Sequence, residues 1–160
     1  MASVLKQTAE SMAKALRESD FIRTSPAIPV ILDFDKDVFE QINKAGSNVG
    51  AMIVVKFDQT GDSIADVPGP ELGECEFTAT VVEVPSVWRS RPGLTPASAQ
   101  IAEAVAQILQ NHRPTDKDGD EYSGSGLVYQ SIKSAVDEST VQHAVTFSIE
   151  LCLPNTPPSR

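Results

Sequence analysis

Apolar residues recur at α-helical spacing in two long segments of the chain, residues 3–19 and residues 96–111. We predict that Ser3 caps the first helix, and that Thr95 caps the second with Pro96 in its first turn. Each helix carries one apolar stripe, so each is expected to pack against a single surface. The stripe positions are Val4, Leu5, Thr8, Met12, Ala15 and Leu16 in the first helix and Ile101, Ala102, Val105, Ile108 and Leu109 in the second.

A shorter helix is predicted over residues 37–46. Asp37 and Glu40 match a capping box, and Gly46 fits the position that follows the last helical residue. The apolar stripe of this helix, which predicts one buried face, consists of Val38, Phe39, Ile42 and Ala45.

Five segments alternate between apolar and polar residues or run as short apolar stretches, which is typical of β-strands. Pro29 places the first strand at a sheet edge or delays its start, and Pro85 ends or bulges the third. The fourth strand should present Val128, Ile132 and Val136 on one face. The predicted strands are residues 28–34, 49–57, 74–88, 127–136 and 140–153.

Residues 137–139 leave room only for a tight turn, so the last two strands form an antiparallel hairpin. One-sided strands need one covered face, which the two long helices can supply. We therefore predict an α+β fold, with a twisted, mostly antiparallel sheet of about five strands and two main helices packed on one face. A length of 160 residues suits a single domain, expected at residues 1–154, with a flexible tail at 155–160.

The charge is unevenly distributed along the chain. There are 22 acidic and 13 basic residues, and residues 58–88 contain seven acids but no lysine or arginine. Tight binding to a phosphate backbone needs clustered basic side chains, so specific nucleic-acid binding is not expected. The simplest interpretation is that the acids keep a solvated surface soluble. The candidate acidic surface consists of Asp58, Asp62 and Asp66 in the predicted loop 58–73, and Asp116, Asp118, Asp120 and Glu121 in the predicted loop 112–125.

No motif in the sequence predicts a catalytic, metal or cofactor site. Residues 33–37 have the D-x-D-x-D spacing that starts a calcium loop. Such a loop also needs Gly at position 6 and Glu at position 12, where this chain has Val38 and Lys44. The acidic segment that starts at Asp116 fails the same test. We therefore expect no enzyme activity, no metal and no cofactor.

The two histidines are interpreted as structural residues. His143 falls on the apolar face of the last strand, where a hydrogen-bonded core histidine is the simplest interpretation. His112 lies at the end of the helix predicted over residues 96–111, where a partial positive charge would suit the helix C-terminus.

The remaining composition indicates a reduced, cytoplasmic setting without a membrane. Cys75 and Cys152 form no C-x-x-C pair and are too few for a disulfide framework. No apolar run is long enough to cross a membrane, and residues 1–19 lack the apolar stretch of a secretory signal.

Trp88 is followed closely by Arg89 and Arg91. An aromatic residue flanked by arginines is typical of protein–protein interfaces, so these three residues are the candidate interface. The alternative is that Trp88 plugs the edge of the core. The long C-terminal hairpin also invites pairing with a neighbouring subunit, because an open sheet edge must be covered or used.

Two stretches of the chain share an order of elements with one known family. Residues 81–114 (VVEVPSVWRSRPGLTPASAQIAEAVAQILQNHRP) give a strand that ends in an aromatic residue and arginines, then a loop and a helix. Residues 127–151 (LVYQSIKSAVDESTVQHAVTFSIEL) give the closing hairpin. With the N-terminal amphipathic helix, this order resembles the tail terminator (tail-completion) proteins of long-tailed bacteriophages. The short helix at 37–46 and the loop 58–73 depart from the family's outline.

The resemblance implies a structural virion protein that is assembled in the host cytoplasm. Proteins of this family form a homo-oligomeric ring, usually a hexamer, on the end of the tail tube. The ring stops tail polymerisation and offers a joining surface, so the implied partners are the tail tube protein and head or neck proteins. DNA would pass through the ring without specific binding, and an acidic lumen would repel it.

Three alternatives fit the same residues. The first is another neck or head-closure component of the virion. The second is a cellular protein-binding adaptor module that makes contact through the loop 58–73 and the region of Trp88. The third is an enzyme that uses His143 or a carboxylate cluster.

Overall fold

The computed structural model describes residues 3–60, 71–123 and 125–152. Within these ranges, five strands form one sheet. The predicted tail at 155–160 lies outside the described residues. In chain order the elements are α1 (Val4–Glu18), α2 (Asp20–Arg23), β1 (Val30–Leu32), α3 (Val38–Asn48), β2 (Ala51–Thr60), β3 (Glu71–Glu83), α4 (Pro85–Trp88), α5 (Ser98–Leu109), β4 (Val128–Val136) and β5 (Val141–Cys152).

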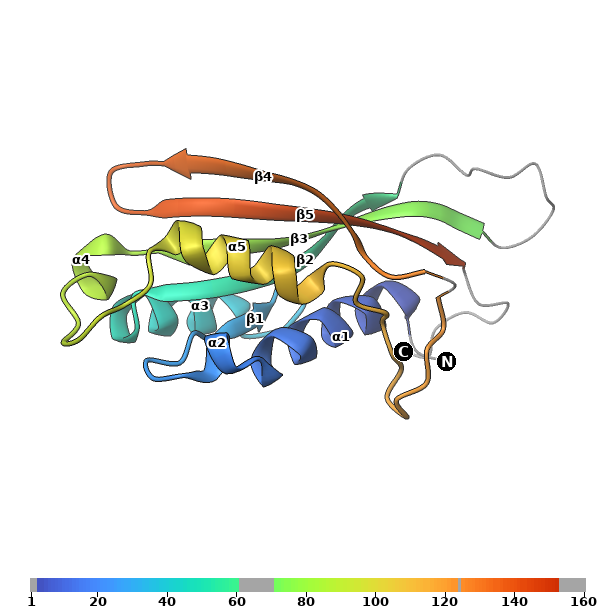
Figure 1. The fold of residues 1–160 in the computed structure, drawn as a ribbon, viewed down its shortest axis with the longest axis horizontal. Coiled ribbons are helices and arrows are strands. Elements are labelled where there is room, and N and C mark those ends of the chain that lie inside the picture. Colours follow the sequence, from blue (N-terminus) through green and yellow to red (C-terminus); the bar gives the residue numbers. More distant parts are fainter. Residues whose placement is uncertain (1–2, 61–70, 124, 153–160) are drawn as a thin grey trace.

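The strand order across the sheet is β1-β2-β3-β5-β4 (Figure 1). β1 runs parallel to β2, and the other neighbouring pairs are antiparallel. The structure therefore confirms the predicted fold class, including the hairpin of the last two strands. β1 lies at a sheet edge and starts only at Val30, so both consequences expected of Pro29 are present.

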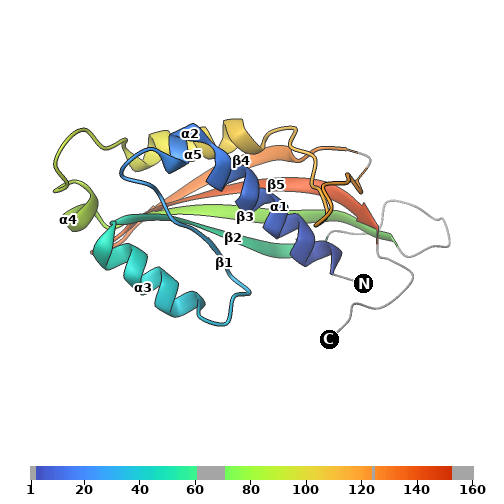
Figure 2. The ribbon, with the colours of Figure 1, turned by 90° about the horizontal axis from the view of Figure 1, so that it is seen from below.

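The two long helices, α1 and α5, pack on the same face of the sheet (Figure 2). α1 contacts β1 and β2, whereas α5 contacts β3 and β5. Ile53, Phe77 and Phe147 from the three central strands are fully buried beneath these helices, and Phe77 lies directly opposite Phe147. Burying a side chain of this size contributes about 1.5–3 kcal/mol, so this face holds the main core.

α3 adds a layer on the opposite face that the predicted fold did not include. Ile31 and Met52 point away from the main core and pack against Ala45 of this helix. Phe39 was predicted to lie in the buried stripe of the helix, but it is 79% exposed. α3 contacts the sheet mainly at β1 and β2, and Ala45 is its buried residue, so Phe39 lies outside the covered strip.

Two helix ends differ from the sequence prediction. α3 continues through Gly46 to Asn48, because Gly46 faces Met52 and Val84 and its small size suits that contact. α5 begins at Ser98 with Ala97 as its cap, not at Thr95 and Pro96. Ser3 caps α1 as predicted, accepting the N–H of Lys6 at 3.3 Å.

The strand ends also differ from the sequence prediction. β2 continues to Thr60 and β3 starts at Glu71, so residues 58–60 and 71–73 of the predicted loop 58–73 are strand. β3 stops at Glu83, and Pro85 begins the short helix α4, which contains Trp88. Proline at the first helical position has the backbone angle that a helix needs, which explains the early end of the strand.

The predicted common face of β4 is wrong at its first residue. The register between β4 and β5 shifts between Tyr129 and Ser131, which marks a bulge. Val128 pairs with Ser148, while Ile132 pairs with the core residue Val145. The extra residue thus moves Val128 to the face away from α5.

Gly50 makes the closest backbone approach in the turn between α3 and β2. Its φ is +93°, and its N–H donates to the carbonyl oxygen of Ala45 at 2.8 Å, which ends α3. A Cβ atom at this position would lie 2.4 Å from the backbone nitrogen of Trp88. Gly50 therefore lets α4 pack directly against the end of α3.

We expect Gly50→Ala to lower the free energy of unfolding by about 3 kcal/mol or more, from a left-handed backbone plus overpacking. Gly93→Ala is the control, because Gly93 has φ +89° but nothing within 4 Å of an added Cβ. That variant should lose only about 1–2 kcal/mol. Urea unfolding of both proteins measures the difference, and equal losses would contradict a steric role for the Trp88 contact.

Candidate functional site

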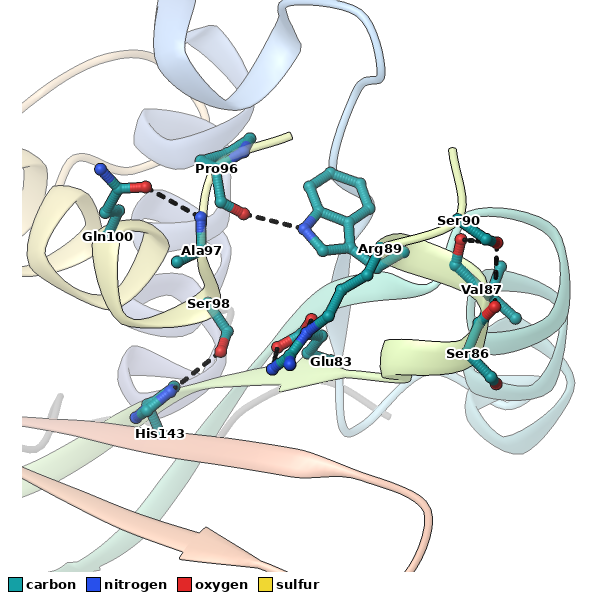
Figure 3. Close-up of polar contacts among 11 residues, drawn as sticks. Glu83, Ser86, Val87, Arg89, Ser90, Pro96, Ala97, Ser98, Gln100 and His143 are labelled. Atoms are coloured by element: carbon teal, nitrogen blue, oxygen red, sulfur yellow. Dashed lines mark hydrogen bonds and ion pairs between the residues drawn. The ribbon is translucent and has the colours of Figure 1, made fainter. Parts of the chain in front are cut away.

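The corner where β3 ends contains a buried carboxylate. Glu83, the last residue of the strand, is 1% exposed. Arg89 follows α4 and donates from Nε to Oε2 at 2.8 Å and from Nη2 to Oε1 at 3.2 Å (Figure 3). A two-point pair of this kind fixes the orientation of both side chains. It is possible because Pro85 begins α4 and turns the chain back over Glu83.

The environment of Glu83 keeps its carboxyl group ionised. Burial by itself would raise the pKa of Glu83, but hydrogen bonds from Arg89 and Ser98 and the charge of Arg89 more than offset burial. The net result is a pKa below the ordinary glutamate value. The carboxylate is therefore a fixed negative charge at the edge of the core.

Trp88 lies inside the subunit. Its side chain is 1% exposed, and its Nε1 donates to the carbonyl oxygen of Pro96 at 2.8 Å. This placement agrees with the core-plug interpretation. Arg89 remains 65% exposed beside Glu83, and Arg91 donates to two carbonyl oxygens at the end of α3 at 3.0 and 3.2 Å. An interface role for the three residues stays a prediction.

Next to the Glu83–Arg89 pair, a chain of hydrogen bonds runs from α5 through β5 to β4. Ser98 is 4% exposed, and its Oγ lies 3.1 Å from Nε2 of His143 (Figure 3). Nδ1 of His143 lies 2.6 Å from Oγ of Ser134. His143 is thus half-buried with both ring nitrogens bonded, in agreement with its predicted structural role.

These residue types also occur in nucleophilic triads, but the order of contacts differs. In a triad the histidine accepts the serine proton at Nε2, and the carboxylate bonds to Nδ1. Here Glu83 pairs with Arg89, and Nδ1 of His143 bonds to the hydroxyl of Ser134 instead of a carboxylate. The hydrogen bonds of His143 tie α5, β5 and β4 together.

A second polar cluster ties the segment after α5 to α1. Oγ of Ser11 accepts the N–H of Thr115 at 3.1 Å and lies 3.0 Å from Nε2 of His112. Burial lowers the pKa of His112 and so favours the neutral ring. This environment disfavours the partial positive charge that was expected at the end of the helix.

Asp58 is a strand residue. It accepts a hydrogen bond from the hydroxyl of Thr78 and pairs with Lys56 at 3.3 Å, so part of its charge is neutralised. Asp62 and Asp66 lie outside the described residues.

The acids of the segment 112–125 have different surroundings. Oδ1 of Asp116 accepts the backbone N–H groups of Asp118 and Asp120 at 2.9 and 3.0 Å, which shapes the loop. Glu121 accepts from Arg113 at 3.4 Å. Asp118 and Asp120 are exposed. A shared role of these residues in an acidic surface stays a prediction.

The sheet face opposite α5 is polar over β3 and β5. Successive outward residues there include Thr78, Thr80 and Thr146. At one end of this face, Glu74 lies directly opposite Glu150. Like charges in that position destabilise a strand pair, so the two acids are placed at a cost to stability. Sequence reasoning missed this pair, because only the register between β3 and β5 brings it together.

Sequence reasoning also missed Glu83, Ser98 and Ser134. Their contacts join distant parts of the chain, as in the 45-residue separation of Ser98 and His143. The only available signal was a single acid in an otherwise apolar stretch of β3.

Several properties of the described residues bear on chemistry. Among residues 3–60, 71–123 and 125–152, no group of three His, Cys, Asp or Glu side chains is placed to hold a metal ion. Within the same ranges, no helix has the length and apolar character needed to cross a membrane. Cys75 is buried and Cys152 is exposed, and both are free thiols.

Comparison with known proteins finds similar folds among solved structures. A chain from the virion of the native gene transfer agent particle matches with a TM-score of 0.61 and 13% identity, over 93% of this chain and 98% of that chain. A second solved structure, one with no descriptive name, matches with a TM-score of 0.52 and 14% identity, over 94% of this chain and 97% of that chain. No protein-family model and no curated protein matches the sequence. At these identities, the likeness concerns the fold.

We expect Arg89→Ala to lower the free energy of unfolding at pH 7, because Glu83 stays buried without its partner. The folded-state pKa of Glu83 is below its unfolded value of about 4.3, so the pair stabilises above that pH. Its contribution disappears as the pH falls through the folded-state pKa. The difference in unfolding free energy between Arg89→Ala and the unaltered protein, measured with urea, should therefore become smaller as the pH is lowered from 7 to 3.

Arg91→Ala is the matched control. Arg91 donates to backbone carbonyl oxygens, which do not titrate, so the deficit of that variant should be the same across the pH range. If the loss of stability in Arg89→Ala were equally independent of pH, this would contradict the role assigned to the Glu83–Arg89 pair.

His112 should make stability pH-dependent in a different range. Its folded-state pKa is below the unfolded value of about 6.5, so its stabilising contribution is present above that pH and is lost as the pH falls. His112→Gln should flatten this decline in urea unfolding between pH 7.5 and pH 5. Tyr122→Phe, which loses a hydroxyl contact to Thr8 at 2.6 Å, should keep the decline. An unchanged slope in His112→Gln would refute the assignment.

Proposed function

We propose that this protein is a structural component of a virion and that it forms a ring that ends a tail tube. The observation that carries the proposal is the fold shared with a chain of the gene transfer agent virion, which spans 93% of this chain and 98% of the other. Coverage of both chains to this extent supports a shared architecture from end to end. The proposed partners are further copies of the chain, the tail tube protein and head or neck proteins.

The shape of the sheet supports a subunit of a larger assembly. β4 is an edge strand whose residues are largely exposed along both faces. A long exposed edge strand promotes aggregation in a protein that stays monomeric. In a protein that assembles, the same edge can lie against a neighbouring copy. The hydrogen bonds of the polar clusters described above hold the elements of the subunit together. This supports a structural, non-catalytic role.

The polar face of the sheet supports a passage for DNA in the ring. Glu74 and Glu150 give one end of this face an acidic pair, and Asp58, bonded to Thr78, adds a further carboxylate. We place this face toward the lumen; Asp118 and Asp120 belong to a loop bonded to α1, on the other side of the sheet. A polar wall with excess negative charge repels the phosphate backbone and lets it slide, whereas clustered lysines would hold it.

The test is the native mass of the purified protein over a concentration series, with negative-stain images of the same samples. We expect a species near six times the subunit mass of 17.1 kDa, seen as a ring with a central hole. Such rings should also bind the end of isolated tail tubes and stop their growth. Rings that join the head side but ignore tube ends would indicate another neck or head-closure component. A monomer that neither assembles at any concentration nor caps tubes would contradict the proposal.

A further inference from the structure

The two lateral edges of the sheet are different. At β1, Nη2 of Arg17 donates to the outward carbonyl oxygen of Val30 at 2.6 Å. The carbonyl oxygen of Leu32 accepts the N–H of Asp35 at 3.2 Å. With these acceptors occupied, β1 is closed to the addition of another strand.

The β4 edge ends in a projecting hairpin. In Figure 1 the turn between β4 and β5 lies beyond the start of α5. Val136, the last residue of β4, is 75% exposed, and every residue from 133 to 139 is exposed. An apolar side chain in this position has no cover from its own subunit.

The tip of this hairpin, residues 136–140, is held by hydrogen bonds of its own and is negatively charged. The carboxylate of Asp137 accepts the N–H groups of Ser139 and Thr140 at 2.8 and 2.7 Å, and the hydroxyl of Thr140 at 2.9 Å. These bonds lower the pKa of Asp137, so it stays ionised. Glu138 adds a second negative charge, and the tip contains no basic residue.

The opposite edge of the sheet contains a complementary depression. This α3–β1 groove has a volume of about 530 Å³ and an apolar floor. The lining includes two positively charged residues, Arg17 and Lys44, and Lys44 forms an ion pair with Glu40 at 3.0 Å. The apolar part of the lining is formed by Pro29, Ile31, Ala45 and Val49.

We propose that the hairpin tip of one copy seats in the α3–β1 groove of the next copy, with Val136 on the apolar floor and Asp137 and Glu138 beside Arg17 and Lys44. This inference rests on the ring proposed above and names its subunit contact. An apolar anchor flanked by opposite charges gives both affinity and register. β-strand pairing with β1 is excluded by the contact of Arg17, so the hairpin enters the groove side-on.

The contact is head-to-tail because its two halves lie at opposite edges of one sheet. A head-to-tail contact repeats from copy to copy and closes into a ring when the rotation allows it. A contact between two hairpins would instead be two-fold symmetric and would stop at a dimer.

Disulfide trapping tests the contact in the full-length chain. Cys152 is first replaced by serine, while Cys75 is buried and unreactive. Val136→Cys and Asn48→Cys are then prepared as separate proteins, since Asn48 lines the groove and is exposed. After mild oxidation, the mixture should give a disulfide-linked dimer that neither protein gives alone. A protein with both substitutions should give a ladder that ends at the ring size. Lys117→Cys, an exposed position near α1, is the control and should not link to Val136→Cys.

Charge reversal provides a second measurement that needs no cysteine. Glu138→Lys and Lys44→Glu should each shift ring formation to higher protein concentration, and mixing the two variants should restore part of the loss. Far-ultraviolet circular dichroism checks that each variant folds.

The outcomes separate this inference from the proposed function. Cross-links only in the mixture, with partial rescue by charge reversal, support the hairpin contact. Rings that form without the cross-link, or with Lys117→Cys linking equally well, overturn the contact but leave the ring intact. A dimer from Val136→Cys alone overturns the head-to-tail arrangement. A protein that forms neither rings nor cross-links overturns both.

Discussion

The buried carboxylate of Glu83 is the constraint on which much of the subunit depends. A charge inside a core must be paired, so Arg89 is drawn back over the end of β3 and the intervening residues form α4. Beside this pair, the hydrogen bonds of Ser98, His143 and Ser134 link the start of α5 to the final hairpin. The ionic pair thus fixes the corner at which the chain leaves β3 and turns back over the sheet.

Much of the architecture could be predicted from periodicity. Alternation over β5 and the helical stripes of α1 and α5 fix which side of each element is buried, because the main core has only one face. The errors fall where a tertiary contact overrides local preference. α5 starts at Ser98 instead of after Thr95 because the carbonyl oxygen of Pro96 is held by Trp88. A bulge in β4 reverses its alternation, and no propensity marks the position of such a bulge.

The candidate site was less accessible to sequence reasoning. The residues Trp88, Arg89 and Arg91 were identified, yet sequence alone left open which would be buried. The indole is inside the subunit and the guanidinium of Arg89 is outside, because the lone acid that fixes this choice lies six residues earlier. The acidic pair of Glu74 and Glu150 depends on register, and the groove beside α3 depends on a helix packing on a face that was expected to stay bare.

The hydrogen bond from Arg17 to β1 also bears on solubility. A sheet with two open edges is a template for unlimited cross-β growth, since each added strand presents a new edge. A sheet with one open edge can recruit a single neighbour by strand pairing, and the joined pair then presents two closed edges. Edge-to-edge growth of the native sheet by strand pairing therefore stops at two subunits.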